Sequence, residues 1–374
     1  MWIPVSRPSI TEEDVNAVAT TLRNGYVSGD APNVTDFENA FAAAVNRRYG
    51  IAVSNGSVAL DLALHALDLQ IGDEVIVPSF TIASCLFAVL RTKATPVFID
   101  VDQATWNLSC DTLHSAITPR TRALLAVHTY GLAIDMDPVI AICQKHQVII
   151  IEDAAEAHSV TYNNKKCGSF GLASTFSFYA NKAITTGEGG MIVTDDDNFA
   201  QRLRGLRNLA FLPAPRPRFV HEEIGWNARL SALQAALGKS QLQRMNDVTE
   251  EKRLTGLKYH ALLSDHPFIR MQPTETLYSR NMYWVVGIVL AEQFDSREVA
   301  KFLRDLGVDT RPFFYPLHRQ PLLERFSLNK QPSLTVSEQL GAQGIYLPSF
   351  VGITENEISF CAQHLKMVLQ DLHR

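Results

Sequence analysis

The sequence predicts an α/β fold, with a large domain built on a mainly parallel β-sheet and a smaller α+β C-terminal domain. Short apolar segments rich in β-branched residues alternate with helical segments over more than a hundred residues, which is typical of a parallel sheet covered by helices. After a long helix predicted over 228–262, the order changes to strand, helix and strand. The chain has 374 residues, which is enough for two domains.

Composition and charge exclude several classes of protein. Hydrophobic residues make up 46% of the chain and charged residues 20%, as in ordinary soluble proteins. The net charge of −5 argues against nonspecific binding to nucleic acid. The N-terminus lacks the apolar core of a signal peptide, and the longest apolar run, 282–291, is too short to span a bilayer. Five cysteines without a Cys-x-x-Cys pair indicate reduced thiols and no zinc site. We therefore expect a cytoplasmic protein that binds neither nucleic acid nor membrane.

The first half of the chain predicts alternating helices and strands. A helix over 10–24 begins with Thr11-Glu-Glu-Asp14, which combines a capping residue with an acidic first turn. Further helices are expected over 35–46 and 58–67. Strands are predicted over 51–53, 74–77, 96–99, 123–127 and 148–151. Polar residues that follow these strands are candidates for ligand binding, because ligands of open α/β sheets bind at the carboxyl ends of strands.

The second half predicts two more strands and then a change of architecture. Strands over 174–179 and 191–194 flank a polar connection that ends in Gly187, Gly189 and Gly190. Beyond the helix over 228–262, we expect a strand over 283–290, a helix over 296–306 and a strand over 310–315. We place the large domain at 1–245 and the small domain at 246–374.

The segment Ser54-Asn-Gly-Ser57 joins a predicted strand to the start of a helix. Free amides at a helix N-terminus attract phosphate, and Gly56 permits a close approach. A plain turn before a capping serine explains the same residues. A P-loop is excluded at Gly238-Lys-Ser240, because Leu233 stands where the upstream glycine belongs.

Two carboxylates follow the apolar strand at 148–151. Asp153 is placed to pair with a cationic ring nitrogen, and Glu156 to bond a phenolic oxygen. A pair of helix-capping carboxylates is the alternative. His128 ends the preceding strand, where a buried histidine bonded to backbone is the favoured interpretation.

Lys182 lies between the last two strands of the large domain. A lysine that forms a Schiff base needs a rigid and partly desolvated place, because its ammonium gives up its proton more readily there. The alternative is a solvated lysine in a Gly-rich hairpin. Together, a phosphate-binding turn, a carboxylate for a ring nitrogen and a lysine nucleophile match the phosphate, the pyridine nitrogen and the aldehyde of pyridoxal 5′-phosphate. A hydride-transfer enzyme would instead need a Gly-rich turn after its first strand, which Ser54-Asn-Gly-Ser57 does not supply.

Ordered motifs run along nearly the whole chain. They are Ser54-Asn-Gly-Ser-Val-Ala-Leu-Asp-Leu62, Gly72-Asp-Glu-Val-Ile-Val-Pro-Ser-Phe-Thr81, Glu152-Asp-Ala-Ala-Glu-Ala157, Gly168-Ser-Phe-Gly171, Phe176-Ser-Phe178, Asn181-Lys182, Thr185-Thr-Gly-Glu-Gly-Gly190, Gly225-Trp-Asn-Ala-Arg229, Thr310-Arg-Pro-Phe-Phe-Tyr-Pro-Leu-His318 and Leu347-Pro-Ser349. This set resembles the DegT/DnrJ/EryC1/StrS family of sugar aminotransferases. The resemblance implies fold type I, as in aspartate aminotransferase, with pyridoxal 5′-phosphate as cofactor. It also implies a homodimer with two active sites shared between the subunits.

Within the family, the sequence is most similar to GDP-perosamine synthases, through Glu156, Asn181-Lys182 and the Thr310–His318 segment. That similarity implies transfer of the amino group of L-glutamate to a nucleotide-linked 4-keto-6-deoxyhexose, first of all GDP-4-keto-6-deoxy-mannose, in O-antigen and lipopolysaccharide biosynthesis. Other dTDP- or UDP-linked 3- or 4-keto sugars remain open as substrates.

The resemblance implies a role for each site residue. Lys182 forms the Schiff base with the cofactor and shuttles a proton, Asp153 keeps the pyridine nitrogen protonated, and Glu156 contacts the ring's O3′. Gly56, Ser57 and Ser177 bind the phosphate, and Asn227 contacts the phosphate held by the neighbouring subunit. Arg229 lies near the donor carboxylate or the sugar nucleotide, and His318 lines the sugar pocket. Arg218, with Arg216 and His221, belongs to a basic loop (211–221) that meets the nucleotide diphosphate. A solvated basic loop is the alternative for the last group.

Two positions depart from the family pattern. Ile82 stands where many relatives have an aromatic residue, so an aliphatic side chain or another segment covers the cofactor ring. Ala228 replaces a tyrosine between Asn227 and Arg229.

Two other functions remain to be weighed. Pyridoxal-phosphate-dependent sugar dehydratases of the family carry histidine in place of the lysine, and Lys182 argues against that activity. A regulatory protein that binds the cofactor without turnover is the second alternative. The joint presence of Lys182, Asp153, Ser177 and Asn227 argues against it.

Overall fold

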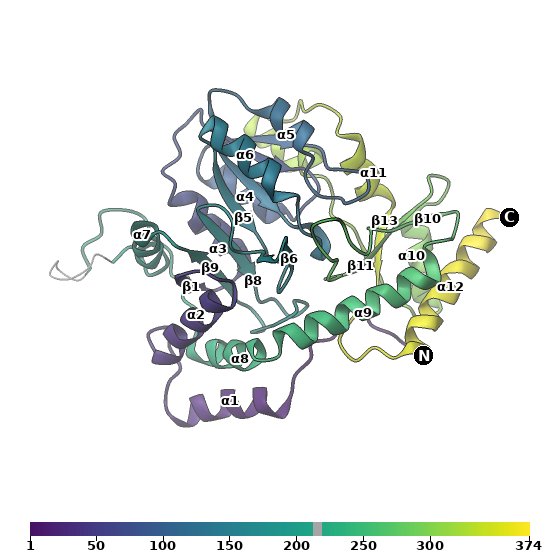
Figure 1. Ribbon diagram of the computed structural model, residues 1–374, viewed down its shortest axis with the longest axis horizontal. Helices are drawn as coiled ribbons and strands as arrows, with labels where there is room; N and C mark the ends of the chain where they lie inside the picture. Colours follow the sequence, from purple (N-terminus) through teal and green to yellow (C-terminus); the bar gives the residue numbers. More distant parts are fainter. Residues whose placement is uncertain (212–218) are drawn as a thin grey trace.

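A seven-stranded sheet organises the larger part of the chain, of which the computed structural model describes residues 1–211 and 219–374 (Figure 1). Its strands are β1 (Tyr49–Val53), β2 (Glu74–Pro78), β3 (Thr95–Ile99), β4 (Thr121–Val127), β5 (Ile149–Asp153), β8 (Ala173–Ser177) and β9 (Gly190–Thr194). Their order in space is β1-β9-β8-β5-β4-β2-β3. Neighbouring strands are parallel, except that β9 runs antiparallel to β1 and β8. The expected α/β class with a mainly parallel sheet is confirmed.

Helices cover both faces of this sheet. They are α2 (Pro32–Ala44), α3 (Gly56–His65), α4 (Ala83–Arg91), α5 (Cys110–Ala116), α6 (Met136–His146) and α7 (Asp197–Arg207). Side chains of α3, α4 and α7 form one core, and those of α2, α5 and α6 belong to another. Along β2, Val75 and Val77 pack in the first core and Ile76 in the second. Burial on both faces explains why the strands of the sequence are uninterrupted apolar runs.

The N-terminal helix α1 (Glu12–Arg23) begins at the predicted capping box. Thr11 Oγ1 accepts a hydrogen bond from Asp14 N at 3.4 Å, and Asp14 Oδ2 accepts one from Thr11 N at 3.0 Å. The same carboxylate accepts from Gln241 at 2.6 Å and from Arg244 at 2.8 Å. These bonds fasten α1 to the end of α8 (Ala232–Leu242).

The prediction of one long helix over 228–262 is wrong, because this region contains two helices. α8 ends at Leu242 and α9 (Met245–Leu263) begins three residues later. Arg244, between them, has φ −112° and ψ 15°, and its guanidinium turns to Asp14 and to the backbone of Ser9. A tertiary contact therefore breaks the helix where the sequence carries no breaker.

A second sheet forms the C-terminal part of the chain. Its strands, in spatial order, are β10 (Ile269–Arg270), β11 (Val286–Leu290), β13 (Gly344–Leu347) and β12 (Arg311–Pro312), all antiparallel. The α-helices of this part are α10 (Ser296–Asp305), α11 (Thr335–Gln343) and α12 (Glu355–His373). A separate hairpin of β6 (Thr161–Tyr162) and β7 (Lys165–Lys166) lies between β5 and β8 in the chain. α9 runs from the first sheet to the second (Figure 1).

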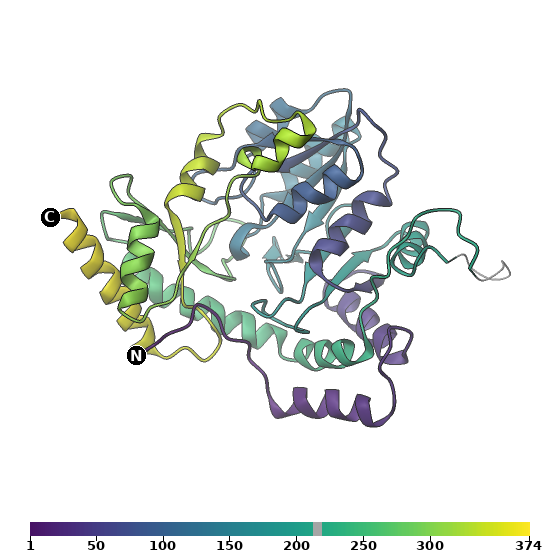
Figure 2. The same cartoon turned by 180° about the vertical axis from the view of Figure 1, so that it is seen from behind.

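The first residues of the chain also pack on the C-terminal sheet, as Figure 2 shows from behind. Ile3 N donates to Gly307 O at 2.9 Å, and Asp309 N donates to Ile3 O at 3.0 Å. Ile3 is fully buried in the core formed by α9, α10 and α12. The division of the chain at residue 245 remains a prediction.

Two strands of this part are shorter than the sequence predicted. The strand expected over 283–290 begins at Val286, because Tyr283 adopts a positive φ of 53° that a strand does not accommodate. The strand expected over 310–315 is only Arg311–Pro312. Pro312 has no amide hydrogen with which to continue the ladder.

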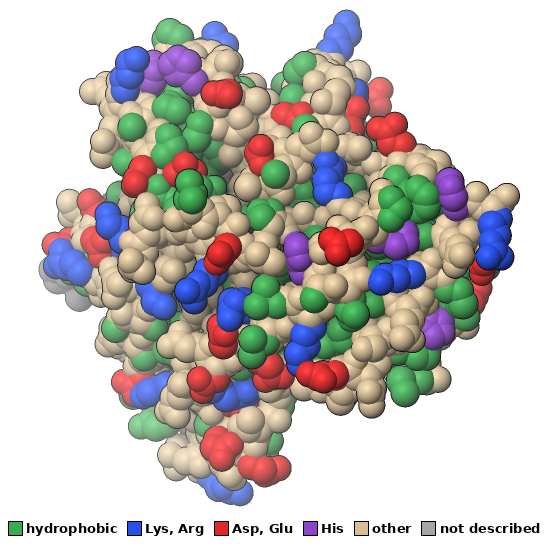
Figure 3. All heavy atoms as spheres, turned by 45° about the vertical axis from the view of Figure 1, so that its right-hand side comes forward, with side chains coloured by type: hydrophobic (Ala, Val, Ile, Leu, Met, Phe, Trp, Pro, Cys, Tyr) green, Lys and Arg blue, Asp and Glu red, His purple; other side chains and the backbone are tan. Residues whose placement is uncertain are grey.

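The surface and the cysteines agree with the composition. All five cysteines are free thiols, as expected. No helix within the two described ranges combines the length and the apolar character that a membrane span requires. Figure 3 shows acidic and basic side chains interspersed over one face of the molecule. That face carries no basic block of the kind used to bind nucleic acid.

His318 lies in the interior, which corrects the expectation that it lines a sugar pocket. Its side chain, in the short helix η2 (Leu317–Arg319), is fully buried. Nδ1 lies 2.6 Å from Ser79 Oγ, and Nε2 lies 2.9 Å from Glu338 Oε1. Both ring nitrogens are therefore occupied by protein groups. His318 and Arg319 lower the pKa of Glu338 to about 2.

Replacing Glu338 tests this anchoring role. Glu338→Gln should lower the free energy of unfolding at pH 7 by about 1–2 kcal/mol, a value reduced for solvent screening because 32% of the side chain is exposed. The folded pKa lies below the ordinary value of 4.5, so the contribution is present above about pH 4.5 and is lost as the pH falls towards 2. Urea unfolding of wild type and variant should thus converge below pH 4.5.

The control for this experiment is Asp305→Asn, which removes the exposed partner of Lys301 at 3.1 Å. It should change the unfolding free energy by less than about 0.5 kcal/mol at every pH. A Glu338→Gln difference that stays constant between pH 7 and pH 3 would contradict the ionic anchor.

Gly256 is a point of close contact between α9 and the C-terminal part. A Cβ at this position would lie 2.2 Å from two ring atoms of Tyr283, which is itself buried. Gly256→Ala should therefore lower the free energy of unfolding by about 1–3 kcal/mol, even though alanine favours a helix by about 1 kcal/mol. Gly205→Ala in α7 is the matched control, because the nearest atom to its Cβ would be 4.0 Å away. Equal stability of the two variants in urea unfolding would show that the contact is not tight.

Candidate active site

The residues predicted to bind the cofactor meet at the carboxyl ends of β5 and β8. They surround a cavity of about 660 Å³, a volume suited to a small molecule. The predicted residues that line it are Gly56, Ser57, Asp153, Glu156, Ser177 and Lys182. Asn227, Arg229 and His318 are not among its lining residues. Arg216 and Arg218 lie outside the described residues.

The start of α3 and the end of β8 form a corner of this cavity. Asn55, and not the expected serine, caps α3, because its Oδ1 accepts from a first-turn amide at 2.9 Å. The amides of Gly56 and Ser57, the first two of the helix, have no acceptor within the helix. A Cβ at Gly56 would lie 2.8 Å from Ser177 Cβ, so only glycine lets the helix approach the strand this closely. The corner therefore offers amide and hydroxyl donors to a phosphate.

Asp153 ends β5 and is buried at the floor of the cavity. Its Oδ1 accepts from Ala155 N at 3.1 Å and from Thr175 Oγ1 at 3.4 Å, and its Oδ2 accepts from Cys85 Sγ at 3.5 Å. Burial raises the pKa of the carboxyl, while the Ala155 amide and the charge of Lys182 act in the opposite direction. The sequence did not reveal Thr175 and Cys85, because both come from other elements and neither stands in a local pattern.

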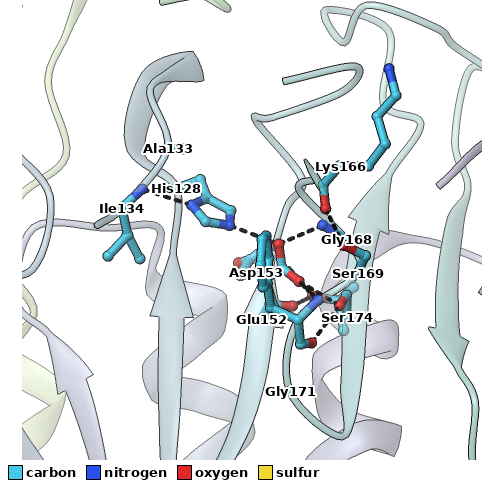
Figure 4. A network of polar contacts seen from close by, with 12 residues as sticks. His128, Ala133, Ile134, Glu152, Asp153, Lys166, Gly168, Ser169, Gly171 and Ser174 are labelled. Atoms are coloured by element: carbon cyan, nitrogen blue, oxygen red, sulfur yellow. Dashed lines mark hydrogen bonds and ion pairs between the residues drawn. The ribbon is translucent and has the colours of Figure 1, made fainter. Parts of the chain in front are cut away.

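The residue before it, Glu152, anchors the end of β5 (Figure 4). Its fully buried carboxylate accepts hydrogen bonds from Gly168 N at 2.5 Å, Phe170 N at 2.9 Å, Ser174 Oγ at 2.7 Å and His128 Nε2 at 2.7 Å. Burial by itself would raise the pKa of Glu152, but these bonds hold it below its ordinary value. The contacts join β4, β5 and β8 at one charged group.

His128 is a structural residue, as expected. Its Nδ1 accepts from Ile134 N at 3.0 Å, so Nε2 carries the proton that it donates to Glu152. Ligand atoms of His128, Glu152 and Cys167 lie within 4.8 Å of one another, which is close enough for a metal ion. The two hydrogen bonds leave the imidazole no lone pair for one.

Lys182 lies in the connection between β8 and β9 and faces Glu156. Its Nζ lies 3.9 Å from Glu156 Oε1 and 3.7 Å from the centre of the Trp284 ring. Only 9% of the side chain is exposed, which excludes the solvated lysine. Burial lowers the pKa of the ammonium, although Glu156 and Asp153 oppose this effect. Burial also raises the pKa of Glu156 to about 7. Burial therefore makes the ammonium of Lys182 easier to deprotonate and the carboxylate of Glu156 easier to protonate.

Aromatic side chains of the C-terminal part close the cavity. Trp284, Phe314 and Tyr346 line it, and none of them was assigned a role from the sequence. Ile82, at the start of α4, lines it as well and is 43% exposed. An aliphatic residue and aromatic residues from distant segments are thus both available to cover a planar ring.

Asn227 and Arg229 lie to one side of the cavity. Asn227 is exposed and forms an isolated β-bridge with Asn208. Arg229 donates to Asn208 Oδ1, and its backbone bridges to Val53. Neither side chain lines the cavity that contains Lys182.

The donors and acceptors of the cavity fit pyridoxal 5′-phosphate. The corner of Gly56 and Ser177 suits its phosphate, and Asp153 suits a protonated ring nitrogen. Lys182 is the only lysine among the described residues that line this cavity, and it supplies an amine for the aldehyde.

Comparison with known proteins identifies the family. The model of the DegT/DnrJ/EryC1/StrS aminotransferase family matches residues 8–366. The GDP-perosamine synthase of Caulobacter vibrioides is 37% identical over 370 residues and 98% of each chain, and that of Escherichia coli O157:H7 is 35% identical over 370 residues and 99% of each chain. A solved aminotransferase from Psychrobacter cryohalolentis covers both chains completely, with a TM-score of 0.89 and 30% identity. The chain therefore belongs to the DegT/DnrJ/EryC1/StrS family and is a pyridoxal-phosphate-dependent aminotransferase of fold type I.

Proposed function

We propose that this enzyme transfers the amino group of L-glutamate to C4 of a nucleotide-linked 4-keto-6-deoxyhexose, with GDP-4-keto-6-deoxy-mannose as the first candidate. The observation that carries the proposal is the meeting of Lys182, Asp153, Glu156 and the Gly56–Ser177 corner in one cavity. The sugar is supported by the relatives named GDP-perosamine synthase, which match over almost their whole length.

The reaction needs a cofactor that accepts electrons. Bound pyridoxal 5′-phosphate supplies an electron-withdrawing ring, which stabilises negative charge on the carbon next to nitrogen. The protein has to hold the ring nitrogen in its charged form, and the buried carboxylate of Asp153 suits this task. Thr175 and Cys85 hold the orientation of that carboxylate through its two oxygens.

Lys182 supplies the nucleophile and then moves a proton. Burial disfavours the charged ammonium and lowers its pKa, so less free energy is needed to deprotonate Lys182. The neutral amine of Lys182 would hold the cofactor through its aldehyde, and the same amine would carry the proton that transamination moves between donor and cofactor. Glu156, whose pKa burial raises to about 7, titrates close to neutral pH and would face the phenolic oxygen of the ring.

The proposal also covers the oligomeric state, the cellular location and the roles of three further residues. We place the enzyme in the cytoplasm as a homodimer, with Asn227 acting on the phosphate held by the other subunit and Arg229 near a substrate carboxylate or nucleotide. The exposed position of Asn227, away from the cavity of its own chain, supports that assignment. Arg218 is proposed to meet the nucleotide diphosphate.

A panel of substrates tests the sugar. GDP-, dTDP- and UDP-linked 3- and 4-keto sugars are incubated with the enzyme and L-glutamate, and the products are identified by mass spectrometry and NMR. The GDP-linked 4-keto sugar should give a 4-amino product at the highest kcat/KM. A preference for another nucleotide, or amination at C3, would contradict the proposed substrate but not the assignment as an aminotransferase. Loss of water from the sugar without amination would indicate the dehydratase.

The first prediction concerns the covalent attachment. The purified protein should be yellow, and sodium borohydride should fix the cofactor on Lys182, because this lysine lies beside Asp153 and the phosphate corner. Peptide mapping identifies the labelled residue. Lys252→Arg, which leaves Lys182 intact, should still be labelled at Lys182. Labelling of another lysine, or full transaminase activity in Lys182→Ala, would refute the assignment.

The second prediction concerns the shared site. Lys182→Ala removes the nucleophile, and Asn227→Asp places a negative charge near the phosphate, so each variant homodimer should be nearly inactive. In a hybrid dimer one site collects both changes and the other is wild type. Random mixing makes half of the dimers hybrid, so the mixture should recover up to about a quarter of wild-type activity under two-fold symmetry.

The hybrid dimers are verified by native mass spectrometry. Mixing each variant with itself is the control and should recover nothing. Hybrid dimers without activity would show that Asn227 acts within its own subunit or has no part in the site.

A further inference from the structure

A second cavity adjoins the one that contains Lys182. It has a volume of about 450 Å³ and lies between the N-terminal segment at 4–8, α9 and the C-terminal sheet. Its residues in common with the first cavity are Tyr179, Asn181, Trp284 and Tyr346. These four residues form a common wall of the two cavities, and the Trp284 ring in this wall has its centre 3.7 Å from Lys182 Nζ.

Lys252, on α9, is a buried cation at the wall of this second cavity. The residue is only 6% exposed, and its Nζ donates to Ser349 O at 2.7 Å. Among residues 1–211 and 219–374, no carboxylate lies close enough to form an ion pair with it, and Glu251 acts on its charge only from a distance. Burial lowers the pKa of Lys252 to about 8, so the side chain is still mainly charged at pH 7. A buried charge without a counter-ion is unfavourable.

The other charges around the cavity do not compensate Lys252. Asp309 is occupied by Arg311, whose Nη1 lies 2.8 Å from Asp309 Oδ1, and by the amide of Val5 at 3.3 Å. Lys252, Arg311 and Asp309 are the charged residues among those that line the cavity, and they leave one positive charge in excess. Arg311 is half exposed, with 49% of its side chain accessible. The cavity therefore suits a ligand with one negative group at the buried end.

Asn181 adds a second polar group to the common wall. Its Oδ1 is buried and accepts no hydrogen bond from the described residues, whereas its backbone oxygen accepts from Trp284 Nε1 at 3.1 Å. Asn181 directly precedes Lys182 and lines both cavities. An amino acid, which carries an ammonium and a carboxylate, would satisfy both Asn181 and Lys252.

We propose that the second cavity binds a carboxylate of the amino donor and of its 2-oxo acid product, with Lys252 as the counter-charge and Arg311 at the exposed side. This inference rests on the proposed function, because that function supplies an amino acid as donor. It assigns glutamate and the keto sugar to different walls of the site. The nucleotide sugar would occupy the first cavity, and the carboxylate would enter from the second.

The binding of 2-oxoglutarate to the cofactor-loaded enzyme tests the proposal without turnover, because the keto acid brings no amino group. Isothermal titration calorimetry should show that Lys252→Met raises the Kd for 2-oxoglutarate at least about tenfold, as expected for the loss of a buried charge partner. The same variant should raise the KM for L-glutamate and leave the KM for the keto sugar unchanged. Lys258→Met is the matched control on the same helix, since Lys258 is half exposed and pairs with Glu355. It should bind 2-oxoglutarate like the wild type.

A second variant protects the test against loss of folding, because Lys252→Met leaves the Ser349 carbonyl without its donor. Arg311→Gln changes a half-exposed side chain, and it should raise the Kd for 2-oxoglutarate severalfold. Unchanged affinity in Arg311→Gln and in folded Lys252→Met would overturn the proposal. If Lys252→Met does not fold, unchanged affinity in Arg311→Gln overturns it alone.

Inorganic phosphate is the second probe and distinguishes the source of the negative group. Phosphate should bind the second cavity much more weakly than 2-oxoglutarate. Equal affinity for both, lost together in Lys252→Met, would show a general anion site and overturn the donor assignment. Failure of the enzyme to aminate any keto sugar would refute the proposed function separately, since the calorimetric result does not depend on turnover.

Discussion

The buried carboxylate of Glu152 is the contact on which the geometry of the active site depends. Its four donors come from the residue after β4, the segment at 168–170 and the start of β8, so one group joins three neighbouring strands near the site. A buried carboxylate is tolerated only when hydrogen bonds replace its hydration, and a buried acceptor left without its donor costs about 1–3 kcal/mol, or more when it is charged. Asp153 is the next residue and Ser177 ends the strand that carries Ser174. Both therefore take their positions from Glu152.

Desolvation sets the acid–base properties of the cavity. Lys182, Asp153 and Glu156 are all buried, and burial disfavours the charged form of each one. The two carboxylates partly restore the charge of Lys182, and Lys182 partly restores theirs. The balance leaves an amine that deprotonates more readily than a surface lysine and a glutamate that titrates near pH 7. These are the properties that a proton-transfer site needs at neutral pH.

Closure of the site depends on the C-terminal part of the chain. Trp284, Phe314 and Tyr346 come from segments more than a hundred residues away from Lys182. They reach the cavity because the C-terminal part packs on the large domain through ring contacts, among them Trp284 with Tyr130 and Phe314 with Phe80. Lys252 is buried in the same region, and no carboxylate of residues 1–211 or 219–374 pairs with it. The uncompensated charge is therefore a consequence of how the two parts meet, and it gives the junction an affinity for anions.

Local patterns in the sequence are enough to predict the strands of the large sheet and the residues that follow them, because apolar runs, glycines and carboxylates at strand ends are neighbours along the chain. These patterns predict Lys182, Asp153, Glu156 and Gly56 as site residues, and all four line the cavity. The surroundings of these residues depend on tertiary contacts. Hydrogen bonds from Thr175 and Cys85, the break at Arg244 and the burial of His318 all join residues that are remote in sequence. Such contacts leave no periodic signal in the chain, since their energy depends on packing between elements and not on neighbours along the sequence.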